Sequence, residues 1–376
     1  MSTLFGKSGF FAAVTAMFLG AGAAQGADLP KATLDLLAKV KLSPDVLNGL
    51  DAELKIPDAW LAAAEKEEPA RINGSWTRKE ADQMNAVFNA RYPKVKIQMI
   101  YAGSYNERAL KPLIAYRAGR FITDAVSGFG GSRSQYVRAK AFEDIRNLPS
   151  FNNPVVGNDP DGGWAAIRLR YWCMAYNTKL VKKEELPKKW EDMLSNPYWH
   201  NGKIGVASRP QLWLAMLWTA HGSDWVMNYM DRFFDTVKPQ HRKEGLSAIV
   251  GLVVAGEFVA SLPSGAGSVK QLAGRGAPVA WHCPDTIPTA VSRVAILKGN
   301  PHPYGTRIWV NWLLSREGQI AQFAADRTSP SHRGLQQSGL MVYPEEIKGK
   351  KVVGEDFDSL KILQKSWDER WEKVKN

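Results

Sequence analysis

The sequence predicts an α/β protein of two domains, each with a mixed, mainly parallel sheet flanked by helices. Removing an export signal of 26 residues from the 376 leaves 350, which is too many for one ordinary hydrophobic core. Hydrophobic residues make up 45% of the chain, enough to fill two cores. Strand-like and helix-like segments also alternate along most of the chain, as in parallel-sheet proteins.

The first 26 residues have the pattern of an export signal. Lys7 is their only charged residue, and about ten apolar residues follow from Phe10 to Leu19. Small residues at Ala24 and Gly26 suit a signal peptidase, so the mature chain is expected to begin at residue 27. The alternative, a membrane anchor, needs about twenty apolar residues. We therefore expect a soluble periplasmic protein, without a lipid anchor because no Cys follows the apolar stretch.

The charge balance is basic, with a formal net charge of +12 at pH 7. Nucleic-acid binding is one interpretation of such a balance. The Lys and Arg residues, however, are scattered among acidic ones in a chain that we expect to be exported. The composition therefore favours an anionic ligand or a negatively charged membrane face, and we expect no nucleic-acid partner.

Two cysteines, Cys173 and Cys283, lie in apolar, strand-like segments. In an oxidising compartment they allow one disulfide, although buried free thiols are the alternative. A zinc site needs more ligands at closer spacing, and His282 beside Cys283 has no such helpers. We expect no metal and no cofactor.

The first half of the chain predicts helices followed by strand–loop–helix units. Prolines at helix starts, Pro44 and Pro57, indicate a helical extension over residues 27–69. Strands are then expected at 71–76, 95–101 and 122–127, with helices at 77–92 and 104–119 between them. Three consecutive units predict a parallel sheet, and ligands bind beyond the C-terminal ends of such strands. The candidate ligand contacts at those ends are Ser75, Trp76, Gly103, Ser104, Gly130 and Ser132.

A second α/β block follows residue 165. It begins with a long apolar strand pair at 165–177, in which Arg168 and Arg170 alternate, and continues with strands at 203–208, 258–262 and 278–283. Arg209 precedes a helix that starts at Pro210, and the segment 264–268 (Ser-Gly-Ala-Gly-Ser) should open another helix. Free N–H groups at helix starts attract oxyanions, although Gly and Ser also serve there as caps. The candidates in this block are Arg209, Ser264, Gly265 and Trp281.

Five ordered segments carry a resemblance to a known family. They are Met174–Val181, Glu185–Leu194, Gly202–Ala207, Ala295–Pro303 and Trp309–Gln319. In order and spacing this set resembles the iron-type and related extracellular solute-binding proteins of ABC importers, over roughly residues 70 to 335. The extension before it and the chain after residue 340 lie outside the resemblance.

The resemblance implies a type 2 periplasmic-binding fold, a clamp of two domains joined by two crossing strands. It implies domain one at 70–172 plus 284–340 and domain two at 173–283, between a helical extension (27–69) and a helical tail (341–376). A disulfide between Cys173 and Cys283 would then tie the crossing strands together. It further implies a small-molecule ligand, a membrane permease as partner and a monomeric protein.

Ferric iron is the first ligand that the resemblance suggests. Iron-binding members have a neighbouring Tyr pair in the second domain, at the place of residues 258–267 here. That segment contains no tyrosine, and no two tyrosines are adjacent anywhere in the chain. We therefore expect an anionic organic solute. A ferric-iron carrier that uses Tyr101, Tyr105 and Tyr171 is the alternative, and the ligand-binding input of a sensor system is a second one.

The sequence does not predict an enzyme. It contains no nucleophile elbow with partnered His and Asp, no Walker loop and no helical His-Glu-x-x-His motif. His282 and Asp285 lie close together, but nothing near them supplies a nucleophile. Binding without catalysis is the function that remains.

Overall fold

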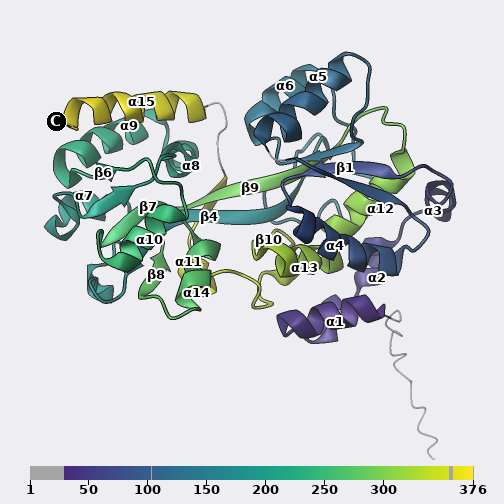
Figure 1. Cartoon of the computed structure of the whole chain (residues 1–376), viewed down its shortest axis with the longest axis horizontal. Coiled ribbons are helices and arrows are strands. Elements are labelled where there is room, and N and C mark those ends of the chain that lie inside the picture. Colours follow the sequence, from purple (N-terminus) through teal and green to yellow (C-terminus); the bar gives the residue numbers. More distant parts are fainter. Residues whose placement is uncertain (1–28, 103, 355–358, 376) are drawn as a thin grey trace, which may run out of the picture.

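The computed structural model describes residues 29–102, 104–354 and 359–375. The expected export signal (1–26) and the candidate Gly103 lie outside these residues. Figure 1 shows two lobes joined by two long strands, β4 (Ala165–Asn177) and β9 (Ile287–Ile296). The predicted α/β class is confirmed, because helices flank one mixed sheet that runs through both lobes.

Lobe one is a sheet covered by helices from both ends of the chain. Its strands are β1 (Ala70–Gly74), β2 (Ile97–Tyr101), β3 (Ala125–Ser127) and β10 (Ser329–Pro330). Its helices are α1 (Lys31–Val40), α2 (Leu50–Leu54), α3 (Asp58–Ala64), α4 (Arg78–Arg91), α5 (Lys111–Arg117), α6 (Arg133–Arg138), α12 (Pro303–Leu314) and α13 (Arg316–Asp326). β1 pairs in parallel with β2 and β3, as the sequence predicts.

Lobe two is built around the far ends of the crossing strands. Its strands are β5 (Ile204–Val206), β6 (Gln240–His241), β7 (Ala260–Gly265) and β8 (Val279–His282). Its helices are α7 (Asp192–Ser195), α8 (Gln211–His221), α9 (Ser223–Arg232), α10 (Ala248–Ala255), α11 (Ala266–Ala273) and α15 (Ser359–Val374). β5 is parallel to β6 and β7, so the C-terminal ends of β5 and β7 lie at the same edge.

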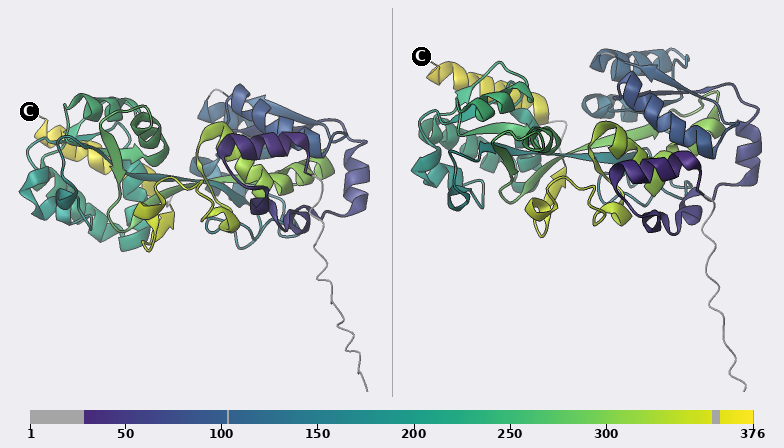
Figure 2. Two further views of the ribbon diagram at one scale, coloured as in Figure 1. Left: turned by 90° about the horizontal axis from the view of Figure 1, so that it is seen from below. Right: turned by 60° about the horizontal axis from the view of Figure 1, so that its bottom comes forward.

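The segment 165–177 forms one long strand, which corrects the prediction of a strand pair. β4 pairs with β9 over Ala165–Tyr171 and with β7 and β8 over Trp172–Asn177. The strand changes its pairing partners where the lobes meet, so residues 165–177 contain no turn. Figure 2 shows β4 and β9 crossing together between the lobes in both views.

Both predicted appendages contribute to the lobes. Leu37 of the N-terminal extension is buried in the core of lobe one, where Thr33 donates a hydrogen bond to the buried carboxylate of Glu317. After residue 340, α14 (Pro344–Ile347) and β11 (Val352–Gly354) lead back to lobe two, and β11 pairs with β9. Leu363 and Trp367 of α15 are then fully buried in the core of lobe two.

Candidate functional site

A cleft of about 450 Å³ lies where the crossing strands meet the two lobes. Lobe one lines it with Glu80 and residues 325–329, β4 with residues 169–172, and lobe two with residues 265–268 and Gln271; Val342 completes the lining. In Figure 1 the helices α11 and α13 lie on either side of this region. A solute in the cleft therefore contacts both lobes at once.

The N-terminus of α11 forms the wall that lobe two contributes. Gly265 precedes the helix, and no side chain caps its first N–H groups. A Cβ atom built on Gly265 would lie 3.2 Å from the ring of Trp172, and one built on Gly267 would lie 3.4 Å from the carbonyl oxygen of Arg327. Small residues thus let the helix start come close to the crossing strand and to lobe one. Uncapped N–H groups at such a start attract negatively charged oxygen atoms.

Two arginines of β4 differ in their pairing. Arg168 is fully buried, donates to the hydroxyl of Ser75 and forms an ion pair with Asp326. Arg170 is half-buried in the cleft lining and has no hydrogen-bond or ion-pair partner among the described residues. The charge of Arg168, together with burial, lowers the pKa of Arg170 to about 10. The cleft therefore contains a guanidinium that forms no ion pair within the described residues, although the charges of Asp326 and Glu80 partly offset that of Arg168.

A third arginine lies at the strand ends of lobe one. Arg108 belongs to a π-helical turn (Asn106–Leu110), a geometry often found at functional sites. Gly128 follows β3 with a φ of +70°, and a Cβ atom built on it would lie 3.0 Å from Arg108 Nε and 3.3 Å from Ser75 Oγ. Arg108 and Ser75 thus both lie close over Gly128, and Ser75 also accepts from Arg168. Burial, and then the charge of Arg168, lower the pKa of Arg108.

Several buried donors in this region have no hydrogen-bond partner. They include the indole N–H groups of Trp76 and Trp172 and the Nε of Arg168. The Arg168 guanidinium lies over the Trp76 ring, 5.5 Å from its centroid. Unpaired buried donors are uncommon in folded proteins, and these N–H groups remain available to an acceptor.

The structure places the lobe-two candidates in different environments. Gly265 lines the cleft. Ser264 does not: it is buried, shares a 2.9 Å hydrogen bond with Ser261 and accepts at its carbonyl from the indole of Trp281. Trp281 is likewise a core residue, 1% exposed. Neighbouring residues of a strand face opposite sides, which separates Ser264 from Gly265. Arg209 is exposed at the start of α8 and lies outside the cleft lining, so its role stays a prediction.

Only some of the candidates in lobe one lie close together. Ser75 and Trp76 both contact Arg168, but neither lines the cleft itself. Ser132 is buried and its hydroxyl lies 2.8 Å from the hydroxyl of Tyr105. Gly130 begins a single 3₁₀ turn. The side chain of Ser104 accepts from Glu107 N and thus caps the following turn, which is the alternative that the sequence left open.

Most lining residues were not among the sequence candidates, and they include Arg170, Trp172, Asp326 and Arg327. One signal for them was present, because a charged residue in the middle of an apolar strand is unusual. The sequence could not show that Arg168 is paired and Arg170 is not. Asp326, which makes the difference, is 158 residues from Arg168 in the chain.

The tyrosines of the iron alternative do not form one group of ligands. Tyr101 donates to Asp82 and Tyr105 bonds Ser132, while Tyr171 lines the cleft. Burial raises the pKa of Tyr171 and of Tyr105, which disfavours the tyrosinate form. Within the described ranges, no group of three or more His, Cys, Asp or Glu residues is placed to hold a metal ion.

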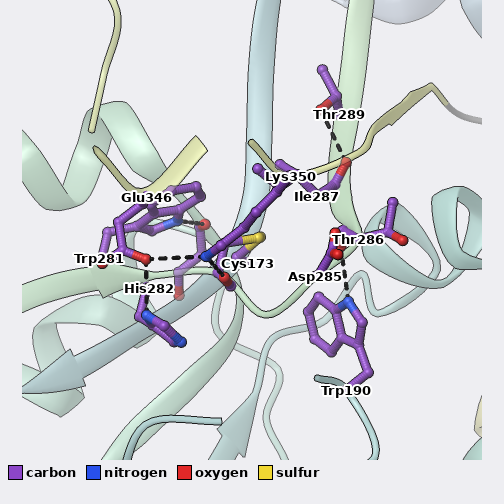
Figure 3. The surroundings of a disulfide bond; sticks show 12 residues. Cys173, Trp190, Trp281, His282, Asp285, Thr286, Ile287, Thr289, Glu346 and Lys350 are labelled. Carbon is purple, nitrogen blue, oxygen red and sulfur yellow. Dashed lines mark hydrogen bonds and ion pairs between the residues drawn. A yellow bond between two sulfur atoms is a disulfide. The ribbon is translucent and has the colours of Figure 1, made fainter. Parts of the chain in front are cut away.

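Cys173 and Cys283 form a disulfide, with their Cα atoms 5.1 Å apart. The bond joins β4 to the connection between β8 and β9. Figure 3 shows what surrounds it: His282 Nδ1 lies 2.9 Å from the carboxylate of Glu346, and Lys350 donates to the carbonyl oxygen of Cys283 at 2.5 Å. His282 Nε2 lies 2.8 Å from the carbonyl oxygen of Pro187. The returning segment with α14 is thereby fastened to the hinge.

Comparison with known proteins agrees with this fold. The family model of bacterial extracellular solute-binding proteins matches residues 126–357. No curated protein sequence matches the chain. A solute-binding protein from Bordetella parapertussis has a TM-score of 0.66 at 15% identity, covering 82% of this chain and 99% of its own.

Two further solved structures are similar and contain different ligands. Iron-bound HitA from Pseudomonas aeruginosa has a TM-score of 0.62 at 18% identity, with 80% of this chain and 99% of its own covered. AfuA from Actinobacillus pleuropneumoniae, with fructose-6-phosphate bound, has a TM-score of 0.55 at 20% identity, with 82% and 98% covered. No helix in the described part of the chain is long and apolar enough to span a membrane. Since the family model covers more than half of the sequence and the fold agrees, the chain belongs to the bacterial extracellular solute-binding proteins, a family of transport proteins.

Proposed function

We propose that this chain is the periplasmic substrate-binding component of an ABC importer, and that it captures a small anionic organic solute. The observation that carries the proposal is the guanidinium of Arg170, which has no ion-pair partner among the described residues, in a cleft that the uncapped N-terminus of α11 also lines. Guanidinium groups and helix N-termini both favour negatively charged oxygen. The solute would then reach a membrane permease, with the protein acting as a monomer and without catalysis or a cofactor.

The same electrostatics argue against ferric iron. A ferric ion in the cleft would lie beside the positive charge of Arg170 and the positive end of the α11 dipole. It would need tyrosinate ligands, and burial raises the pKa of Tyr171. The related structures include one with iron and one with fructose-6-phosphate, so the fold alone does not select the ligand. The residues of the cleft favour the anion.

Ligand-driven closure follows from the position of the cleft. Its lining comes from lobe one, β4 and lobe two, so a bound solute adds contacts that hold the lobes together. Binding then shifts the population toward the closed form, which a permease can recognise. The crossing strands β4 and β9 are where the lobes would rotate against each other.

A thermal-shift screen of residues 27–376 tests the ligand class. The panel contains phosphate esters, mono- and dicarboxylates, neutral sugars, polyamines and ferric citrate. A ligand at about a hundred times its dissociation constant stabilises the fold by about 2.7 kcal/mol, which raises the unfolding midpoint by several degrees. We expect an anionic organic compound to produce the shift. A shift with ferric salts alone would overturn the proposal in favour of iron.

The variant Arg170→Met should abolish that shift. Arg138→Met is the matched control, because Arg138 is an exposed arginine of α6 without a partner among the described residues. Delivery is tested in cells: deleting the gene should stop uptake of the identified solute. If uptake persists and only a transcriptional response to the solute disappears, the protein is a sensor input instead.

A further inference from the structure

We propose that the anionic group bound by this protein is the doubly charged phosphoryl group of a phosphate monoester, held by Arg108, Arg168 and Arg170. This inference rests on the proposed function and narrows it from anions in general to tetrahedral dianions. It assigns the end of the ligand that carries the phosphoryl group to β4 and the strand ends of lobe one. The remainder of the solute would then extend toward the N-terminus of α11.

The three guanidinium groups belong to one connected arrangement. Arg168 donates to Ser75, and Ser75 and Arg108 both lie close over Gly128. Arg170 is two residues from Arg168 on β4 and lines the cleft. The charge of Arg168 lowers the pKa of both other arginines, so the three charges repel one another in the absence of a ligand. An anion placed among them removes that repulsion.

The charge count favours an anion with two negative charges. Asp326 is engaged by Arg168. Glu80 caps α4 through a 2.7 Å hydrogen bond from the backbone N–H of Thr77. No described carboxylate forms an ion pair with Arg108 or Arg170, although the charges of Asp326 and Glu80 act on Arg170. Arg327, an exposed residue, also lines the cleft. Four arginines (Arg108, Arg168, Arg170 and Arg327) and two carboxylates (Glu80 and Asp326) thus leave two positive charges around the site.

The hydrogen-bonding groups at the site also fit a phosphoryl group. The unpartnered atoms of Trp76, Trp172 and Arg168 are all N–H donors, and guanidinium and indole groups have no acceptor atoms. Three terminal phosphoryl oxygens accept more hydrogen bonds than the two oxygens of a carboxylate. Arginine is moreover the residue whose planar, forked donors match phosphate geometry.

The second ionisation of a phosphate monoester makes the proposal testable by pH. Its pKa is about 6, so the dianion is nearly complete at pH 7.5 and is about a tenth of the total at pH 5. The charged and titratable groups around the site are Glu80 of α4, Arg108, Asp326, Arg327 and the Arg168, Arg170 and Tyr171 of β4. None of the described lining residues is a histidine. A change in affinity between these pH values would therefore report the protonation of the ligand.

The experiment is calorimetric titration of wild-type residues 27–376 at pH 7.5 and pH 5. The probes are glycerol 3-phosphate, phosphoethanolamine and a sugar 6-phosphate, each with its sulfate-ester counterpart. Succinate is added as an anion whose two charges lie on separate planar carboxylates. We expect at least one phosphate ester to bind, with affinity about tenfold lower at pH 5. Its sulfate counterpart, a monoanion at both pH values, should bind more weakly and without pH dependence.

Arg108→Met supplies a second, independent arm. It should reduce the preference for the phosphate over the sulfate ester at least tenfold, whereas Arg138→Met should leave that preference unchanged. If Arg108→Met does not fold, the wild-type pH comparison still decides. Binding of succinate but of no phosphate ester, or equal affinity for phosphate and sulfate esters, overturns this inference and leaves the proposed function standing. Binding of ferric citrate or neutral sugars alone overturns both.

Discussion

Two adjacent parts of the hinge strand β4 differ in how their polar groups are satisfied. On the cleft side, Arg170 has no partner and the indole of Trp172 has no acceptor among the described residues. One residue further, Cys173 is cross-linked to Cys283, and the neighbouring His282, Glu346 and Lys350 all have close polar partners. The paired part fastens the crossing strands and the segment with α14 to each other. The unpaired part retains donors that a ligand can use.

The alternation of side chains along a strand makes this division possible. Trp172 and Cys173 are neighbours in sequence and project to opposite faces. Trp172 lies against Gly265 at the start of α11, whereas Cys173 faces the connection that leads into β9. One strand can therefore be rigid on one face and adaptable on the other. Substitutions on the two faces should have different consequences for stability and binding.

Removing the disulfide should have the largest effect on stability. Cys173 and Cys283 are 110 residues apart, so the bond closes a long loop in the unfolded chain. We expect the double variant Cys173→Ala and Cys283→Ala to lose about 2–5 kcal/mol of unfolding free energy. Urea unfolding of both proteins measures the loss, and reduced wild type is the control. A loss below about 0.5 kcal/mol would show that the cross-linked part does not carry this role.

Arg168 and Arg170 offer a matched pair two residues apart. Arg168→Met leaves the buried carboxylate of Asp326 without its charged partner, although Thr328 still donates to it, and should cost about 3 kcal/mol of stability. Arg170→Met removes a charge that Arg168 repels, so the ligand-free protein should be as stable as wild type or more stable. Urea unfolding without ligand measures both variants. Equal destabilisation by the two would mean that Arg170 is also a structural residue.

The fold was largely predictable because local patterns report it. The apolar spacing of the helix at Thr77–Tyr92, and the strand segments on either side, placed β1, α4 and β2 close to their observed positions. The error at 165–177 has a physical origin. A strand of 13 residues is much longer than the usual five or six, so the sequence pattern favoured two strands. A strand that changes partners between lobes leaves no local mark in the sequence.

The site was less predictable because pairing is not a local property. Gly265 lines the cleft, and small residues at a helix start are visible in the sequence, while its contact with a ligand stays a prediction. Ser264 was offered on the same grounds, yet its side chain faces the core, and only the register of β7 against β4 separates the two. Arg170 is a candidate because it has no ion-pair partner among the described residues, whereas Arg168 is paired with Asp326. Asp326 lies on a helix far away in the sequence, so the sequence alone does not show this difference.

The contact between His282 and Glu346 should give the smallest effect, and one that depends on pH. Burial raises the pKa of Glu346, but contact with His282 and the charges of His282 and Lys350 outweigh it, so the pKa is lowered. A carboxyl group with a lowered pKa stabilises the folded state above its unfolded pKa of about 4.5, and the contribution disappears as the pH falls through the folded value.

Glu346→Gln should therefore cost about 1 kcal/mol at pH 7 and progressively less below about pH 4.5, because a partly exposed ion pair such as the one with Lys350 is worth about that much. Urea unfolding between pH 7 and pH 3 measures the difference from wild type. The control is Glu345→Gln, which makes the same charge change at an exposed neighbour without a partner in the described chain. If the two variants follow the same pH curve, the segment with α14 is fastened by packing rather than by charge. If only Glu346→Gln shows the predicted slope, the paired part of the hinge stabilises the fold through its polar groups as well as its disulfide.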